Sequence, residues 1–269
     1  MKRKFVFSIL GGLCLGLGIY STFIEPKRLT TTHLEIITEK NGSFVRIVHL
    51  SDLHIGKFYG QRCVEKLVDK VNAVNPDIVV FTGDLFDRFD CYLREETAMP
   101  LKKIRAPLGK YAVWGNHDRT HMRWRFSQFL EKIDFTLLVN TGATICLQNQ
   151  KRLAIAGTDD WLYGNPDKQA VITAMAGKDY RILLMHEPDA ADLMDAHSVD
   201  LILSGHTHGG QVKLPCCPTV TTPMGKKYAR GLFKVGESAF LYVNRGIGTT
   251  HLPLRAGAIP EITVIDIKI

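Results

Sequence analysis

Two histidines separated by one residue are the first feature of the sequence that could do chemistry. His206 and His208 lie in the segment GHTHGGQ (205–211), directly after the apolar run LIL (201–203). Side chains at positions i and i+2 of an extended chain point to the same face, so the two imidazoles can meet at one place. Neutral imidazole is among the commonest metal ligands in proteins. The spacing therefore predicts a metal site at the end of a buried strand.

Four further segments place aspartate, asparagine or histidine directly after short apolar runs. They are DLH (52–54), GDLFD (83–87), GNHD (115–118) and HEP (186–188). An aspartate after a strand usually caps a helix or closes a turn, and a lone histidine is usually buried with its hydrogen bonds satisfied. Five such segments together instead predict one shared site, because open α/β sheets bind ligands beyond the carboxyl ends of their strands. The candidate metal ligands are Asp52, His54, Asp84, Asn116, His186, His206 and His208.

The chain alternates between strand-like and helix-like segments, which predicts the α/β class. Apolar residues recur at helical spacing from Val64 to Val74, and Pro188 is well placed to begin a helix that runs to Met194. After Gln211 the helical periodicity fades. Short β-rich runs predict strands at 44–50, 78–82, 111–114, 152–156, 181–185, 199–203, 239–243 and 261–267.

Composition limits the partners of this domain. A chain of 269 residues, 45% of them hydrophobic, can bury one full-sized core. The net charge of +7 would suit nucleic acid or an anionic membrane. The lysines and arginines are scattered, however, which favours a solvated basic surface and argues against nucleic acid as a partner. Six cysteines without C-x-x-C spacing predict neither a zinc finger nor a disulfide framework.

The N-terminus differs from the rest of the chain. Residues 5–24 carry no charge and, as a helix, are long enough to cross a hydrocarbon core of about 30 Å. A cleaved signal peptide is the alternative, but no A-x-A-like site precedes Glu25. We therefore expect a signal-anchor or transmembrane segment over 1–30 and one globular domain over 31–269. The basic start MKRK slightly favours an exported domain, by the positive-inside rule.

The five segments, taken in order, resemble the calcineurin-like metallophosphoesterases, whose blocks are D-x-H, G-D-x-x-D, G-N-H-[DE], a lone histidine and G-H-x-H. All five occur between residues 52 and 208. The GHTHGGQ ending, GTDDW (157–161) and RGIG (245–248) are most similar to the membrane-associated bacterial branch of that family. The resemblance implies two mixed β-sheets packed as a sandwich flanked by helices, and a domain anchored at a bacterial plasma membrane.

The resemblance also implies a role for each site residue. His117 would contact the phosphate and protonate the leaving oxygen, and Asp87 would orient its imidazole. Arg119 and Arg245 are candidate contacts to the substrate phosphate. The mixed imidazole, carboxylate and amide ligands suit two divalent ions of Mn, Fe or Zn, whose identity the sequence leaves open. The implied ligands are Asp52, His54, Asp84 and His208 for the first ion, and Asp84, Asn116, His186 and His206 for the second.

The expected function is that of a dinuclear metal-dependent phosphohydrolase. We expect a phosphodiesterase or pyrophosphatase that acts on a lipid-linked or cell-envelope phosphate, with a UDP-2,3-diacylglucosamine-type pyrophosphate as one candidate substrate. The alternatives are a broad-specificity phosphodiesterase or nuclease, and a non-catalytic membrane-bound metal-binding scaffold. The intact pair of His117 and Asp87 argues against the scaffold. The sequence makes no prediction of the oligomeric state.

Overall fold

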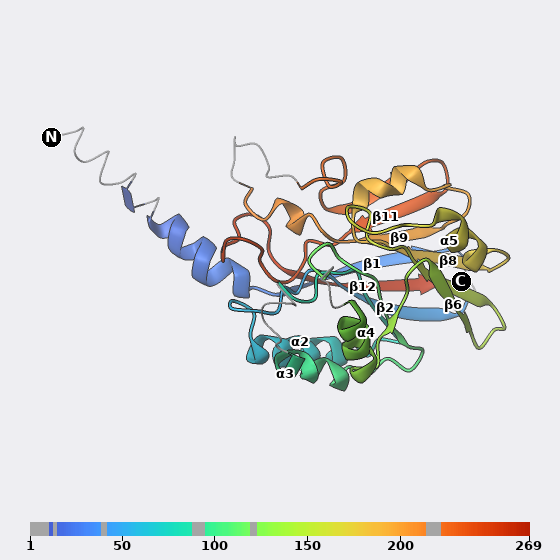
Figure 1. Ribbon diagram of the computed structural model, residues 1–269, viewed down its shortest axis with the longest axis horizontal. Helices are drawn as coiled ribbons and strands as arrows, with labels where there is room; N and C mark the ends of the chain where they lie inside the picture. Colours follow the sequence, from blue (N-terminus) through green and yellow to red (C-terminus); the bar gives the residue numbers. More distant parts are fainter. Residues whose placement is uncertain (1–10, 13–14, 39–41, 88–94, 119–122, 214–221) are drawn as a thin grey trace.

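Two mixed β-sheets form the centre of the protein. The computed structural model describes residues 11–12, 15–38, 42–87, 95–118, 123–213 and 222–269. Within these residues each sheet has six strands, and the strand orders are β1-β12-β2-β3-β4-β5 and β10-β11-β9-β8-β7-β6. The predicted architecture of two mixed sheets flanked by helices is confirmed (Figure 1).

The first sheet is parallel except where β12 pairs with β2. In the second sheet, the β10–β11 and β6–β7 pairs are antiparallel and the others are parallel. The first sheet contains β1 (Thr30–Ile37), β12 (Glu261–Lys268), β2 (Phe44–Leu50), β3 (Ile78–Phe81), β4 (Lys110–Ala112) and β5 (Thr136–Leu137). The second contains β10 (Gly231–Val235), β11 (Ala239–Val243), β9 (Leu201–Ser204), β8 (Tyr180–Leu184), β7 (Arg152–Gly157) and β6 (Thr141–Cys146).

Hydrophobic side chains fill three layers, one between the sheets and one on the outer face of each. In β2, Ile47 packs between the sheets, whereas its neighbour Val48 packs on the outer, helix-covered face. A strand buried on both faces is expected to be continuously apolar, and β3 (IVVF) has that pattern. The helices over the first sheet are α2 (Gln61–Ala73), α3 (Glu95–Ala98), η3 (Met99–Lys103) and α4 (Arg123–Lys132); those over the second are α5 (Lys168–Met175) and η4 (Pro188–Leu193) (Figure 1).

The sequence predicted the buried strands and missed strands at the sheet edges. The predicted strands 44–50 and 239–243 agree with β2 and β11 to the residue. The four edge strands, β1, β5, β6 and β10, were not predicted. They alternate between half-buried and exposed residues or carry few apolar ones, so their sequences give a weaker signal. Pro188 begins a helix as predicted, but it is the short 3-10 helix η4.

The predicted membrane anchor is wrong. No helix in the described part of the chain is long and apolar enough to cross a membrane. Residues 1–10 and 13–14 of the expected anchor lie outside the described residues. Residues 15–19 are helical and continue through the π-helical turn η1 (Tyr20–Ile24) into the 3-10 turn η2 (Glu25–Lys27). The expected localisation at a bacterial plasma membrane depended on this anchor, and that prediction is therefore wrong as well.

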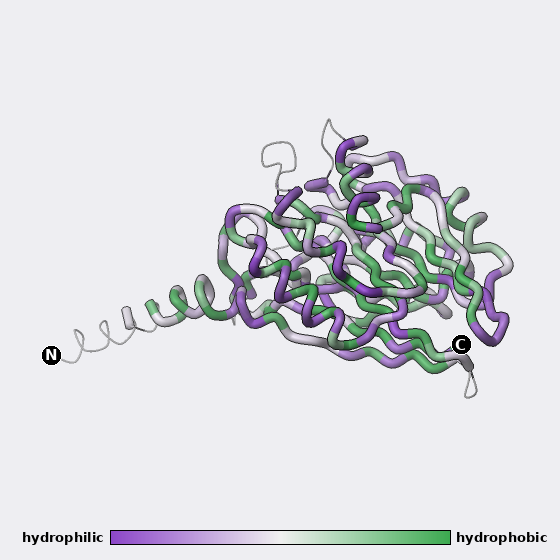
Figure 2. Tube along the Cα trace, turned by 90° about the horizontal axis from the view of Figure 1, so that it is seen from below, coloured by the Kyte–Doolittle hydropathy of each residue, from purple (hydrophilic) through white to green (hydrophobic). Residues whose placement is uncertain are grey.

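The end of the expected anchor instead packs against the globular body. The carbonyl of Ser21 accepts a hydrogen bond from the amide of Arg255, and the carboxylate of Glu25 accepts one from the amide of Ala258 at 2.7 Å. Ser21 and Glu25 are both buried. Figure 2 shows the helical segment leaving the body beyond these contacts. These contacts join the end of the expected anchor to the globular body.

A buried histidine in the first sheet makes the fold sensitive to acid. His49 is fully buried in β2, and its Nε2 lies 2.8 Å from Thr82 Oγ1. Burial lowers the pKa of His49 from 6.5 to about 3. The unfolded chain therefore takes up a proton at His49 below pH 6.5 that the folded protein does not, and stability is lost as the pH falls.

We expect His49→Gln, which keeps a polar nitrogen near Thr82, to weaken this dependence. Below about pH 6 the free energy of unfolding of the wild type should fall more steeply than that of the variant, by about 1.4 kcal/mol per pH unit. Urea unfolding between pH 7.5 and 5 measures both slopes. His33→Gln, at an exposed position of β1, is the control and should behave as the wild type. Equal slopes for the wild type and His49→Gln would contradict this account.

Candidate metal centre

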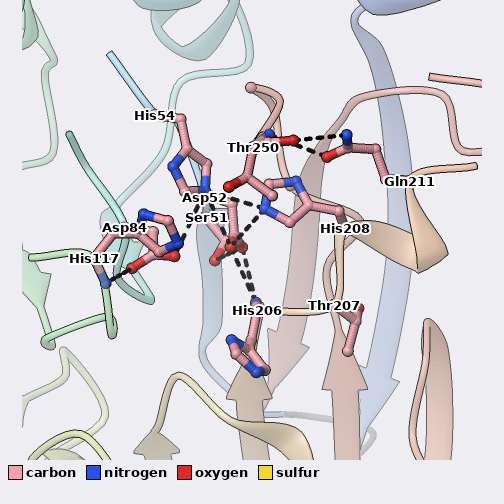
Figure 3. Close-up of polar contacts among 12 residues, drawn as sticks. Ser51, Asp52, His54, Asp84, His117, His206, Thr207, His208, Gln211 and Thr250 are labelled. Carbon is pink, nitrogen blue, oxygen red and sulfur yellow. Dashed lines mark hydrogen bonds and ion pairs between the residues drawn. The ribbon is translucent and has the colours of Figure 1, made fainter. Parts of the chain in front are cut away.

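The five polar segments meet at the carboxyl ends of five strands. Asp52 follows β2, Asp84 follows β3, Asn116 follows β4, His186 follows β8 and His206 follows β9. Because β2, β3 and β4 run parallel, as do β8 and β9, these ends lie on one side of the sandwich. Figure 3 shows side chains from both sheets converging there. The structure thus brings together the ligand atoms that the sequence predicted as one site.

One cluster is formed by Asp52, His54 and His208. The Nε2 atoms of His54 and His208 are 3.1 Å apart, and Asp52 Oδ1 lies 3.4 Å from His208 Nε2. The other carboxylate oxygen of Asp52 accepts hydrogen bonds from Ser51 Oγ at 2.6 Å and from the His206 amide at 3.0 Å (Figure 3). These bonds fix the carboxylate with Oδ1 directed at the imidazoles.

The second cluster is formed around Asn116. Its Oδ1 lies 3.1 Å from His186 Nε2 and 3.0 Å from His206 Nδ1. The opposite nitrogen of each ring faces a backbone carbonyl, at 2.6 Å for His186 with Thr82 and 2.7 Å for His206 with Pro223. A carbonyl can only accept, so each outer nitrogen carries the proton and the inner nitrogens present lone pairs toward the amide oxygen. Three lone-pair donors facing one another are what a cation requires.

Asp84 connects the two clusters through a single oxygen. Its Oδ2 lies 3.5 Å from His54 Nε2 and 3.3 Å from His186 Nε2, while its Oδ1 accepts a hydrogen bond from the amide of His117 at 2.8 Å. Burial opposes the charge of Asp84, but the neighbouring histidines, His186 first, hold its pKa well below the ordinary value. The site therefore keeps Asp84 ionised, which fits a bridging ligand of two divalent ions.

Five of these site residues have backbone in the left-handed region. The φ angles lie between 44° and 70° for Asp52, His54, Asp84, His206 and His208. Such conformations are uncommon for residues with a Cβ atom and cost roughly 1–3 kcal/mol each. Glycine follows or precedes several of them, and a Cβ at Gly205 would overlap Ser51 Oγ and the Asp52 carboxylate. The backbone strain is concentrated where the side chains must converge.

Asp118 is a site residue for which no role was predicted. It is fully buried, and its two oxygens accept backbone N–H groups of Gly115, Asp84 and Leu85 at 3.1, 2.7 and 2.9 Å. Burial, followed by the charge of Asp84, raises the pKa of Asp118 to about 7. The block GNHD could have indicated this role, because an aspartate three residues after Gly115 can accept a hydrogen bond from the Gly115 amide. Asp118 holds the loop that carries Asp84.

Arg255 supports the other side of the site and was not predicted either. It is fully buried and donates to the backbone carbonyls of Gly248, Arg245 and Ala258, and its guanidinium lies 3.2 Å from His208 Nδ1. Burial lowers the pKa of Arg255 to about 10, so it stays charged at neutral pH. Nothing near Arg255 in the sequence distinguishes it from an exposed arginine.

His117 lies at the open side of the first cluster. Its ring centroid is 4.9 Å from that of His54, and its Nδ1 is 3.1 Å from the carbonyl of Asp87. The carboxylate of Asp87 is farther, at 3.9 Å from the same nitrogen. Burial lowers the pKa of His117, but Asp84 and the Asp87 carbonyl outweigh it and raise the pKa. Asp87 is thus placed beside His117, although its backbone makes the shorter contact.

The two predicted arginine contacts have different outcomes. Arg119 lies outside the described residues. The guanidinium of Arg245 pairs with the carboxylate of Glu261 and lies 3.2 Å from Thr32 Oγ1, on the first sheet. Contact between Arg245 and a substrate phosphate stays a prediction.

The comparison with known proteins identifies the family. The profile of the calcineurin-like phosphoesterase family matches residues 45–210, which contain all five segments of the site. The chain belongs to this family, whose members use divalent metals to hydrolyse phosphoester bonds. The family confirms the predicted resemblance.

Curated relatives from bacteria and animals are metallophosphoesterases. An uncharacterized metallophosphoesterase of Bacillus subtilis is 36% identical over 99% of this chain and 97% of its own length. A putative metallophosphoesterase of Caenorhabditis elegans is 33% identical over 96% of this chain. A transmembrane protein with metallophosphoesterase domain from Danio rerio is 31% identical over 94% of this chain. The chain spans only 55% and 60% of the length of these two animal relatives.

Solved structures share the fold at low sequence identity. The NAD nucleotidase of Haemophilus influenzae matches 77% of this chain with a TM-score of 0.54 and 15% identity. A 5'-nucleotidase precursor of Thermus thermophilus matches 84% with a TM-score of 0.52 and 16% identity. The chain spans about half the length of these structures, 46% and 55%.

We expect Asp118→Asn to weaken metal binding without removing a ligand. The introduced asparagine side chain has only one oxygen that can accept hydrogen bonds. Some backbone N–H groups near Asp84 would therefore lose their acceptor, and each unpaired buried N–H costs about 1–3 kcal/mol. At pH 8, where Asp118 is ionised in the wild type, Mn(II) affinity measured by calorimetry should fall about 10- to 100-fold.

Asp77→Asn is the matched control for this change. Asp77 also accepts a backbone N–H, from Arg46 at 2.7 Å, but it lies at the opposite end of β2. The Asp77→Asn variant should have a lower free energy of unfolding than the wild type and the same Mn(II) affinity. Folded Asp118→Asn with unchanged Mn(II) affinity would show that the loop does not need this carboxylate.

Proposed function

We propose that the protein is a dinuclear metal-dependent phosphodiesterase or pyrophosphatase whose substrate carries a lipid-linked or cell-envelope phosphate. The observation that carries the dinuclear site is the single Asp84 oxygen between His54 and His186. A UDP-2,3-diacylglucosamine-type pyrophosphate is the candidate substrate, on the resemblance to the bacterial branch of the family. The proposed ligands are Asp52, His54, Asp84 and His208 for one ion, and Asp84, Asn116, His186 and His206 for the other.

Bound there, two divalent ions supply Lewis acidity and make water a nucleophile at neutral pH. No protein nucleophile is needed beside them. The hydroxyl of Ser51 donates a hydrogen bond to Asp52 and is held in that bond. The water would therefore attack the phosphorus directly.

His117 is proposed to give a proton to the leaving oxygen. Its raised pKa keeps the imidazole protonated at higher pH than an ordinary histidine, as a general acid requires. The carbonyl of Asp87 fixes the ring through Nδ1, which leaves Nε2 as the nitrogen able to meet a substrate. Asp87 is thus a positioning residue, and the proton moves from His117 Nε2.

The test is hydrolysis of bis(p-nitrophenyl) phosphate and p-nitrophenyl phosphate by the full chain with Mn(II), Fe(II) or Zn(II). We expect metal-dependent turnover with the diester preferred, which chelator and Asp84→Ala both abolish. His117→Ala should keep two bound ions and lose about 10²- to 10⁴-fold in rate. The loss should be larger for a phenyl ester than for a p-nitrophenyl ester, because the more basic leaving group depends more on protonation.

His33→Ala is the control for His117→Ala, since it removes an exposed histidine of the edge strand β1, which β12 separates from β2. Equal loss of metal in His117→Ala and Asp84→Ala would mean that His117 is a ligand and not an acid. No turnover with any of the ions, despite two ions bound, would favour the non-catalytic scaffold. Cleavage of DNA that Asp84→Asn abolishes would favour the nuclease.

A further inference from the structure

A cavity of about 720 Å³ lies between the N-terminal helical segment and α2. Its volume falls within the range of about 300–1,000 Å³ typical of small-molecule sites. Most of its lining is apolar: Phe23, Leu29, Phe58, Tyr59, Ile247 and Pro253 are among its residues. Phe23 and Phe58 are 61% and 53% exposed, so two large aromatic rings stand open to solvent at this one place. Apolar surface gathered around a cavity is typical of a binding site.

Four lysines line the same cavity. They are Lys27, Lys57, Lys66 and Lys70, and no carboxylate of the described residues is among the lining. Lys70 donates to the carbonyl of Leu29 at 2.7 Å, which holds its charge at the cavity. An apolar interior with a cationic border complements a molecule that has alkyl chains and anionic groups.

One loop connects the cavity with the metal centre. Ile247 and Gly248 line the cavity, and the amide of Gly248 donates to the carbonyl of the ligand Asp52 at 2.7 Å. A Cβ at Gly248 would overlap the carbonyl of Leu53, so the wall is closely packed against the ligand segment. Farther along the same loop, the ring of His251 is 6.3 Å from that of His117. The cavity and the site therefore lie on two sides of one loop.

We infer that this cavity binds the alkyl chain of a phosphate ester whose phosphate lies at the metal centre. The lysines bind further anionic groups of the same molecule. This inference rests on the proposed function and adds to it a binding site for the apolar part of the substrate. Each methylene buried in such a cavity raises affinity about fourfold.

The test compares p-nitrophenyl decyl phosphate with p-nitrophenyl methyl phosphate, both below micelle-forming concentrations, with the Mn(II)-loaded full chain. We expect kcat/KM for the decyl ester to exceed that for the methyl ester by about 100-fold or more, mainly through KM. Phe58→Asp places a charge at the cavity and should reduce this ratio at least about 10-fold. Phe44→Asp is the matched control: Phe44 is 56% exposed, begins β2, and does not line the cavity.

Binding gives a readout that is independent of turnover. Decyl phosphate should bind the wild type and Phe44→Asp in calorimetry with equal affinity, and bind Phe58→Asp at least about 10-fold more weakly. A decyl-to-methyl ratio near one in the wild type, or a ratio unchanged in Phe58→Asp, would overturn the inference. A wild-type dimer that Phe58→Asp dissociates, with both esters hydrolysed equally, would assign the cavity to a second copy of the chain.

Failure of the proposed function has a different signature. If neither ester is hydrolysed with bound Mn(II), the proposed activity is contradicted. Decyl phosphate that still binds, and binds more weakly to Phe58→Asp, would then leave the alkyl site in place. If the methyl ester is hydrolysed and the decyl group does not raise kcat/KM, the proposed activity is supported and the alkyl site is contradicted.

Discussion

The shared carboxylate of Asp84 is the contact on which the rest of the site depends. Its Oδ2 faces a histidine of the first sheet, His54, and a histidine of the second sheet, His186. The two sheets must therefore be packed in one fixed position for the two clusters to share this oxygen. The layer of apolar side chains between the sheets sets that position, and the helices on both outer faces keep each sheet buried. Packing throughout the sandwich thus positions Asp84 Oδ2 between His54 and His186.

The fold stores strain where the ligands converge. Five site residues have left-handed backbone, and buried polar contacts hold them there. Asp118 binds the amides around Asp84, Ser51 and the amide of His206 bind Asp52, and Arg255 contacts His208. Such contacts are worth more in a buried site than in water, so they can offset the cost of the strained conformations. The residues that support the ligands are therefore as necessary as the ligands.

The sequence predicted the clustered aspartate and histidine side chains better than the residues that support them, for a physical reason. His206 and His208 were predictable because strand geometry directs alternate side chains to one face, and the apolar runs before each segment marked the strand ends. Arg255 comes to His208 through a contact between residues 47 positions apart, which no local pattern reveals. The edge strands β1 and β10 were missed because only part of their surface is buried. Residues 5–24 were predicted to span a membrane from hydropathy and length alone, and no helix in the described part of the chain is long and apolar enough to do so.

A crystal structure of the Mn(II)-loaded protein, with anomalous scattering from manganese, would locate the metal ions relative to Asp84. A dinuclear site that shares Asp84 predicts two peaks about 3.5–4 Å apart, one beside each cluster, with Asp84 within bonding distance of both. A single peak, or two peaks that do not share Asp84, would contradict it.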